Sequence, residues 1–228
     1  MKNVIVTGAS RGIGYQISIQ LAEKGHRVYA IARSESKLNA LAATNVNIIP
    51  IVADLTSEIG QHDVKSVLDE INRVDILINN AAKLDNVSFM KSNIQAWKQL
   101  FEVNLFSIIE LIQFCKPKMI SGGHIVNIGS MGGVQGSKKF TGLSTYSTSK
   151  GALAILTECL ALEFSPDQIA VNCLALGAVS TEMQREAFPD FEAPVSATEM
   201  GKFISDFALN GHTFINGKIL PISFSDPE

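Results

Sequence analysis

Short apolar runs alternate with longer amphipathic stretches along almost the whole chain, and this alternation constrains the fold more than any other feature. We expect strands at residues 4–6, 27–32, 47–53, 74–79, 124–129, 169–175 and 218–221. Continuously apolar strands joined by helices are typical of parallel sheets that are buried on both faces. With right-handed crossovers, the pattern predicts an α/β fold with a doubly wound parallel sheet of about seven strands and helices on both faces.

The amphipathic stretches predict the helices. We expect them at residues 13–24, 35–43, 57–71, 94–100, 102–119, 144–164 and 197–208, with Ser57 as an N-cap. We find no repeat, linker or low-complexity tract, so a single domain is expected over residues 1–228. Ligands of such a sheet bind outside the carboxyl ends of its strands, which is where functional motifs should fall.

The charge pattern argues against nucleic acid as a partner. The net charge is −3 and neither sign forms a long run, so no basic surface is expected. The pair Lys138 and Lys139 is expected in a solvated loop. No stretch approaches 18 uninterrupted apolar residues and the start lacks a signal-peptide pattern, which predicts a cytoplasmic protein with no membrane span.

The cysteines and histidines predict no metal site. Cys115, Cys159 and Cys173 are widely spaced and odd in number, so we expect packed thiols rather than disulfides or zinc ligands. The histidines have no metal-ligand spacing and are expected at the surface or in turns; they are His26, His62, His124 and His212.

The first expected strand runs into a glycine-rich turn that opens the first expected helix. Gly8, Gly12 and Gly14 follow Thr7 with the spacing GxxxGxG. Glycines at such a turn let backbone N–H groups approach a pyrophosphate at a helix N-terminus. An ordinary strand-to-helix turn also uses glycine. The position after the first strand nevertheless favours a dinucleotide site.

Together with four further segments, this spacing resembles the short-chain dehydrogenase/reductases of the compact single-domain type from residue 3 to about residue 222. Asp54 follows the third strand, and Asn79-Asn80-Ala81-Ala82 resembles the family's NNAG after the fourth. Asn104, Ser130 and the YxxxK pair of Tyr146 and Lys150 follow in the family's order. The resemblance implies a Rossmann-type fold.

The resemblance also implies a cofactor site. It assigns dinucleotide binding to Gly8, Ser10, Arg11, Gly12, Ile13, Gly14, Arg33, Asp54, Leu55, Asn80, Ala81, Val103, Tyr146, Lys150, Gly177, Val179 and Thr181. Asp54 would contact the adenine ring and could also cap the turn after it, since the two roles are compatible. The acid that usually binds the NAD ribose is replaced by Ala32 and followed by Arg33, which could also be a plain surface residue. With Arg11 as a second arginine, the sequence favours NADP(H) over NAD(H).

The implied catalytic residues are Asn104, Ser130, Tyr146 and Lys150. Tyr146 and Lys150 are four residues apart and share a helix face, as an ordinary exposed pair would. We expect the Lys150 ammonium to lower the pKa of Tyr146, which would exchange a proton with a carbonyl or alcohol oxygen. Ser130 would bind the same oxygen, and Asn104 would hold a water that links the lysine to solvent.

Three features depart from the family pattern. The loop between Ser130 and Tyr146 has 15 residues and is longer than usual, and Leu176 replaces a proline before Gly177. The segment 181–197, which forms the substrate lid in relatives, is short and acidic. A brief lid predicts an open or shallow pocket.

The sequence leaves the substrate open between a 3-oxoacyl thioester, a steroid-like ketone, a sugar and a pterin. A non-enzymatic NADP(H)-binding, redox-responsive regulator on the same fold is the alternative function. In relatives the helix at residues 144–164 pairs with its symmetry mate, so a homodimer or homotetramer is expected; packing of its apolar face in the core is the alternative.

Overall fold

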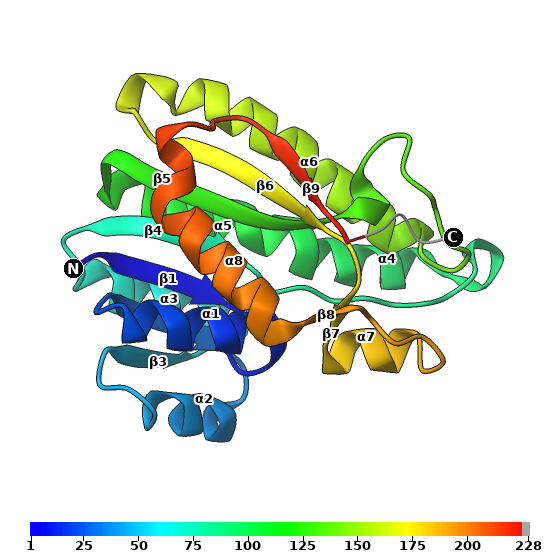
Figure 1. Ribbon diagram of the computed structural model, residues 1–228, viewed down its shortest axis with the longest axis horizontal. Helices are drawn as coiled ribbons and strands as arrows, with labels where there is room; N and C mark the ends of the chain where they lie inside the picture. The colour runs from blue at the N-terminus through cyan, green and yellow to red at the C-terminus, as the bar shows by residue number, and fades with distance from the viewer. Residues whose placement is uncertain (225–228) are drawn as a thin grey trace.

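Seven parallel strands form one sheet in the order β3-β2-β1-β4-β5-β6-β9 (Figure 1). The structure, a computed structural model, describes residues 1–224. Neighbouring strands pair in parallel throughout, and the chain switches direction across the sheet between β1 and β4. The expected doubly wound fold is confirmed. The strands are β1 (Asn3–Thr7), β2 (Arg27–Ala32), β3 (Ile48–Val52), β4 (Val74–Asn79), β5 (Met119–Ser130), β6 (Ala170–Leu176) and β9 (Ile219–Ile222).

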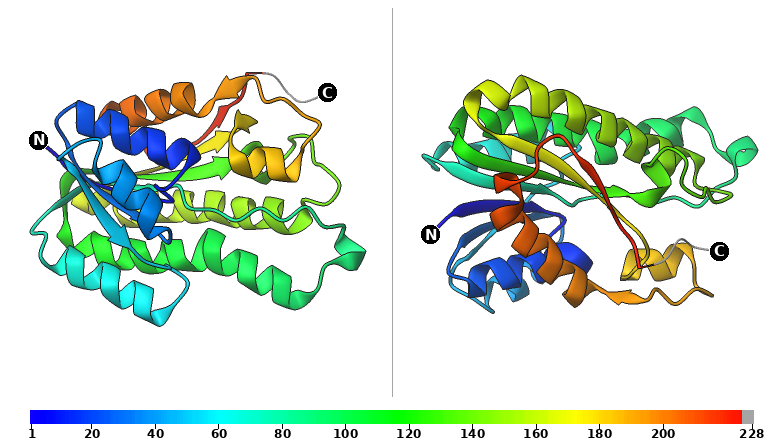
Figure 2. Two further views of the ribbon diagram at one scale, coloured as in Figure 1. Left: turned by 90° about the horizontal axis from the view of Figure 1, so that it is seen from below. Right: turned by 45° about the horizontal axis from the view of Figure 1, so that its top comes forward.

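Helices cover both faces of the sheet and give three layers (Figure 2). Successive strand residues point to opposite faces, so Val4 and Val6 belong to one apolar core while Ile5 belongs to the other. The first core lies under α1 (Gly12–Glu23), α2 (Glu35–Ala42) and α8 (Ala197–Asn210). The second lies under α3 (Glu58–Asp69), α5 (Ser107–Cys115) and α6 (Ser144–Glu163), and α4 (Ile94–Phe101) packs beside α6.

The helix expected at residues 102–119 is shorter in the structure. A π-helical turn, Glu102–Phe106, joins α4 to α5, and α5 ends at Cys115. Pro117 lies in the following turn and lacks the N–H that would continue the helix, so β5 begins at Met119. The N-cap at Ser57 is confirmed, because its side chain accepts a hydrogen bond from the Gly60 N–H at 3.1 Å.

The acidic segment before α8 contains a helix and two short strands that were not expected from its sequence. A short helix, α7 (Glu182–Ala187), begins at the Thr181 cap. The flanking residues form a two-stranded parallel sheet of β7 (Val179–Ser180) and β8 (Val195–Ser196). This unit lies beyond the carboxyl ends of the main strands (Figures 1 and 2).

Two expectations about single side chains are wrong. His124 is fully buried in β5, where hydrogen bonds compensate for the loss of water at both ring nitrogens. Nδ1 lies 3.0 Å from Ala208 O, and Nε2 lies 3.0 Å from Asn172 Nδ2. Cys159 is exposed on α6, since an apolar helical run does not reveal which side faces outward. Cys115 and Cys173 are buried, as expected, and all three thiols are free.

Within residues 1–224, no helix has the length and apolar character needed to cross a membrane. The same part of the chain contains no group of three His, Cys, Asp or Glu side chains that could hold a metal ion.

Candidate active site

The carboxyl edge of the sheet brings together the motifs that the sequence analysis singled out. Gly8 follows β1, Asn80 follows β4, Ser130 ends β5 and Gly177 follows β6. These strands are neighbours in the sheet, so residues far apart in the sequence meet at one edge. This is the position at which α/β sheets bind ligands.

The glycine loop has the geometry that a dinucleotide pyrophosphate needs. Gly8 and Gly12 have positive φ angles of 67° and 57°, which L side chains rarely adopt. A Cβ on Gly14 would lie 2.4 Å from Gly8 O, and a Cβ on Gly12 would extend into the space toward Thr181. No side chain caps α1 and its first turn contains no acid, so its N–H groups can meet an anion. Ser10 lies in the glycine loop, and Ile13 lies in the first turn of α1.

Thr7 fixes the strand ends on either side of this loop, a role that the sequence analysis missed. Its hydroxyl accepts hydrogen bonds from the N–H groups of Asn80 (3.0 Å) and Ala81 (2.9 Å). The Asn80 amide donates to Thr7 O at 2.9 Å. The side chain of Asn80 is therefore engaged with β1. Asn79 Nδ2 donates to Asn127 Oδ1 at 2.8 Å and so ties β4 to β5.

The residues expected around the adenosine are placed near the ends of β2 and β3. Asp54 Oδ1 accepts hydrogen bonds from Thr56 N at 3.0 Å and Thr56 Oγ1 at 2.7 Å, so it caps the local turn. Burial raises the pKa of Asp54, but these bonds outweigh it and hold the pKa below its usual value. Leu55 is half-buried against the second core, and Arg33 is exposed directly after β2.

Tyr146 and Lys150 lie on α6 beside the end of β5. Lys150 is only 2% exposed, and its Nζ donates to Ile128 O at 2.8 Å. Burial lowers the pKa of Lys150 to about 8, and nearby Cys173 opposes that shift. The Lys150 Nζ lies 5.9 Å from the centre of the Tyr146 ring. The base and the phenol thus belong to one cluster.

The expected effect of Lys150 on Tyr146 is not met. Burial raises the pKa of Tyr146, and a hydrogen bond with the Ser130 side chain offsets part of that rise. The ammonium of Lys150 donates to a backbone carbonyl instead of stabilising the phenolate directly. The Ser130 hydroxyl oxygen also accepts the Gly132 N–H at 3.1 Å, which fixes its position.

Asn104 is fully buried in the π turn, and its side chain connects three segments. Its Oδ1 accepts from Lys83 N at 2.8 Å, and its Nδ2 donates to Lys83 O at 2.9 Å and to Ser149 Oγ at 3.0 Å. The Ser149 hydroxyl in turn donates to Tyr146 O at 2.8 Å. Asn104 therefore supports the helical turn that carries the tyrosine and lysine. Val103, next to it, is half-buried.

Gly177, Val179 and Thr181 lead from β6 into the lid. A Cβ on Gly177 would lie 2.5 Å from Ser223 Oγ and 3.2 Å from Ser223 Cα, so the packing against Ser223 favours glycine here. Val179 is buried in β7, and the Thr181 hydroxyl accepts from Gln184 N at 3.2 Å to cap α7.

The lid helix α7 is held at both ends. At its start, Arg11 of the glycine loop forms an ion pair with Glu182. At its end, Asn86 Nδ2 donates to Ala187 O at 3.1 Å, and the rings of Phe140 and Phe188 lie 6.5 Å apart. The short lid therefore bridges the cofactor loop and the long loop before α6. Beside this contact lies a hollow of about 440 Å³ lined by Phe89, Lys139, Phe140, Thr141, Gly142, Leu143, Ser144, Ser147 and Thr148.

Comparisons with known proteins agree with this fold. Residues 2–192 match the family model described as short chain dehydrogenase. Human L-xylulose reductase is 32% identical, with 89% of this chain and 83% of that protein covered. Carbonyl reductase (NADPH) 2 of Sus scrofa is 33% identical, and the match covers 82% of this chain and 76% of that protein. Among solved structures, the fold is similar to that of a short chain dehydrogenase of Burkholderia cenocepacia in complex with NADP. The TM-score is 0.87 at 26% identity, and the match covers 97% of this chain and 96% of that one.

The chain belongs to the short-chain dehydrogenase/reductase family. It is an oxidoreductase of a family that binds a nicotinamide cofactor and acts on small molecules.

Proposed function

We propose that this protein is an NADP(H)-dependent oxidoreductase that reduces a carbonyl group or, in the reverse direction, oxidises an alcohol. The observation that carries the proposal is the cluster of Ser130, Tyr146 and Lys150 beside the glycine loop. A carbonyl reductase named for NADPH and a solved relative with bound NADP support the choice of cofactor. The absence of an acid after β2 and the presence of Arg11 and Arg33 support it independently.

In this mechanism the bound dinucleotide would supply or accept the hydride. Tyr146 donates its phenolic proton to the carbonyl oxygen, and Ser130 Oγ donates a hydrogen bond to the same oxygen as negative charge develops. Lys150 donates its hydrogen bond to Ile128 O, and its ammonium, 5.9 Å from the centre of the Tyr146 ring, acts on the tyrosinate only as a nearby positive charge. Asn104 holds the turn between these two residues in place.

The substrate class is a small ketone or a 3-oxoacyl thioester. An apolar rim supports this choice, since Phe89, Phe140 and Leu143 line the hollow beside the lid. Such a rim suits the hydrocarbon part of a carbonyl compound.

The test compares wild type with Tyr146→Phe on a panel of ketones and 3-oxoacyl thioesters. We expect wild type to consume NADPH with at least one substrate, and the variant to lose turnover by about 10²- to 10⁴-fold. NADPH binding, measured by nicotinamide fluorescence, should be retained. Tight NADPH binding with turnover unaffected by the substitution, or with no turnover on the whole panel, would favour the non-enzymatic regulator. Tyr15→Phe, on α1 away from the cluster, is the matched control.

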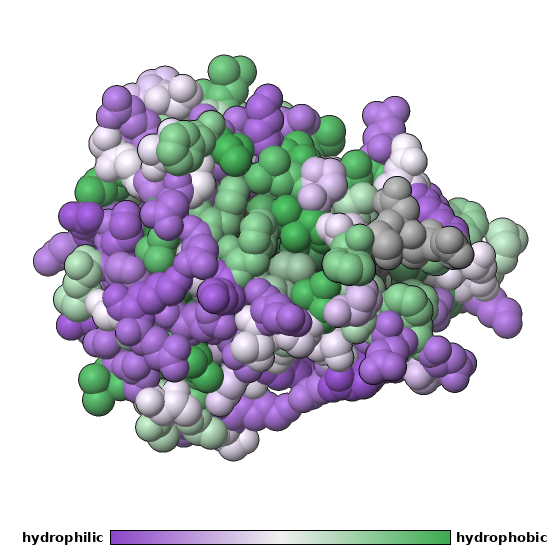
Figure 3. Space-filling model, viewed as in Figure 1, coloured by the Kyte–Doolittle hydropathy of each residue, from purple (hydrophilic) through white to green (hydrophobic). Residues whose placement is uncertain are grey.

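We also propose a homodimer or homotetramer in the cytoplasm. On α6 the apolar side chains of Ile155 and Leu162 are exposed, and Phe106 is exposed just before α5. Apolar residues also gather over β9 and the adjoining part of α8, where β9 forms the edge of the sheet (Figure 3). Exposed apolar surfaces of this kind commonly mark subunit contacts. The free thiols suit a reducing compartment.

A further inference from the structure

An ion-pair cluster joins the glycine loop to the lid. Arg11 Nη1 lies 2.7 Å from Glu182 Oε2 and 3.5 Å from Glu186 Oε1. The same Glu182 oxygen lies 3.7 Å from Lys37 Nζ on α2. Arg11 and Glu182 are 171 positions apart in the sequence, so only the fold brings them together. A carboxylate therefore occupies one of the two arginines that the proposed function assigns to the cofactor.

The carboxylate is held there by the backbone of the lid. Glu182 opens α7, and the Thr181 side chain caps that helix. The far end of α7 is fixed separately by the Asn86 bond to Ala187 O and by the contact between Phe140 and Phe188. If the ion pair between Arg11 and Glu182 opened, α7 would therefore stay anchored, and Glu182 would remain close to the Arg11 guanidinium.

Competition with a phosphate follows from this geometry. A guanidinium binds a phosphate best through two parallel N–H donors, and Glu182 already takes one of the Arg11 nitrogens. Any phosphate that approaches Arg11 must displace the carboxylate or bind beside a negative charge. Lys37 offers the displaced carboxylate a second cation within a short side-chain movement.

We propose that Glu182 is a specificity-determining residue, which competes with the 2′-phosphate of NADP(H) for Arg11 and thereby weakens the preference for NADP(H) over NAD(H). The inference rests on the proposed function, because it takes Arg11 as a 2′-phosphate ligand. When NADP(H) binds, Glu182 exchanges Arg11 for Lys37. NAD(H), which has no 2′-phosphate, leaves the pair with Arg11 intact.

Two nucleotide fragments test this without any turnover. Adenosine 2′,5′-bisphosphate carries the 2′-phosphate and 5′-AMP lacks it, so the ratio of their dissociation constants isolates that group. We expect Glu182→Gln to tighten the bisphosphate by about 3- to 10-fold, as one partly exposed charge pair would, and to change 5′-AMP by less than about 2-fold. Calorimetry at low salt gives both constants.

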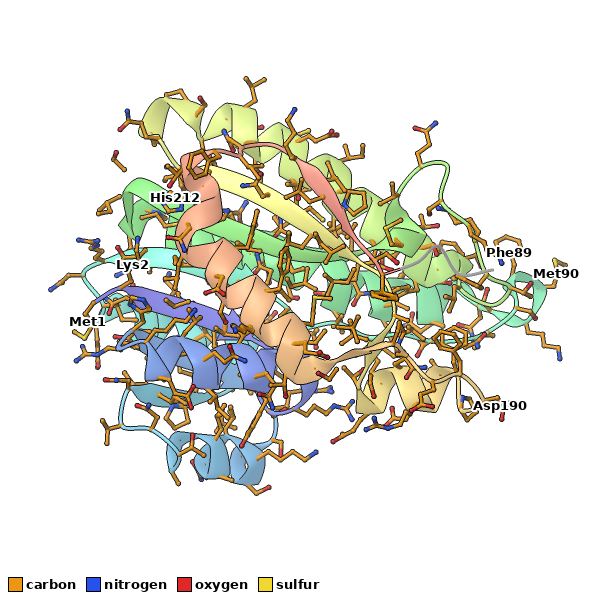
Figure 4. The ribbon with its side chains drawn as sticks, in the orientation of Figure 1. Met1, Lys2, Phe89, Met90, Asp190 and His212 are labelled. Carbon is orange, nitrogen blue, oxygen red and sulfur yellow. The ribbon has the colours of Figure 1, made fainter. Side chains whose placement is uncertain are left out.

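The matched control is Asp190→Asn, which removes one negative charge from the same lid segment. Asp190 lies in the turn after α7 (Figure 4), is exposed, and forms no ion pair within residues 1–224. Its substitution should leave the ratio within about 2-fold of wild type. An equal shift in this control would mean that overall charge, not Glu182, sets the ratio, and the inference would be overturned.

A double variant separates competition from simple repulsion. In an Arg11→Gln background, Glu182→Gln should no longer shift the ratio, because the shared partner is gone. A persisting shift, or no shift in the single variant, would overturn the inference. Wild-type turnover of NADPH with a carbonyl tests the proposed function separately: turnover with an unchanged ratio defeats only the inference, and a shifted ratio with no turnover on the panel defeats only the proposed function.

Discussion

Two buried bases are associated with β5 and differ in their roles: His124 belongs to the strand, and Lys150 binds it from α6. Lys150 donates to Ile128 O near the carboxyl end of β5, and His124 lies four residues earlier on that strand. Both of the ring nitrogens of His124 have protein partners, and burial lowers its pKa to about 4. Lys150 has one bond, and its pKa is lowered to about 8.

The difference shows what burial does to a base in each setting. His124 is neutral at physiological pH and is fully hydrogen-bonded, so it serves the fold. The pKa of Lys150, about 8, lies near physiological pH, so its amine is still largely protonated there. It also lies beside half-buried Tyr146, so it can take part in proton transfer. The residues around His124 lie at the end of the molecule marked by His212 and Lys2, opposite the end marked by Phe89 and Met90 (Figure 4).

A substitution of Lys150 should separate the two bases most strongly, through its effect on activity. Replacing Lys150 with methionine removes the ammonium while keeping an apolar side chain, and turnover should fall by about 100-fold or more. The free energy of unfolding should be unchanged or higher, since a buried charge is removed. Steady-state kinetics and urea denaturation measure the two quantities. Unchanged turnover would remove Lys150 from the proposed mechanism.

The next effect is acid destabilisation through His124. Its pKa is about 4 in the folded protein and about 6.5 when unfolded, so the unfolded chain binds the proton more readily. The stability contributed by the neutral ring is complete above pH 6.5 and is lost as the pH falls toward 4, by up to about 3 kcal/mol. Denaturation at several pH values measures this slope. A slope that His124→Leu does not reduce would assign it to other groups, such as His212, whose pKa burial also lowers.

The smallest effect concerns His124→Leu at neutral pH. Ala208 O loses its partner, whereas Asn172 Nδ2 keeps its bond to Ile215 O at 2.8 Å. One unsatisfied buried group predicts a loss of about 2 kcal/mol in the free energy of unfolding, with kcat per folded molecule unchanged. His62→Leu, on α3 and exposed, is the control and should change stability by less than about 0.5 kcal/mol. A large fall in kcat for His124→Leu would mean that the two ends of β5 are coupled.

Most of the fold was predictable because its signals are local. Apolar runs located all seven strands of the main sheet, and Ser57 marked a helix start by a bond to Gly60, three residues away. The helix predicted through residue 119 failed at Pro117, although the proline was visible in the sequence. The lid helix α7 was missed because its six residues carry too little pattern to stand out.

The candidate active site also has features that were predictable and features that were not. The order of the residues was enough to show which chemical groups the protein has and that they follow strand ends: the glycine spacing, Ser130, Tyr146 and Lys150. The partners of these groups became known from the packing of the folded chain. That packing paired Arg11 with Glu182, directed Lys150 to Ile128 O and buried His124 between α8 and β6. The physical reason is that local patterns report backbone periodicity and polarity, whereas a hydrogen bond between distant residues depends on how whole elements pack.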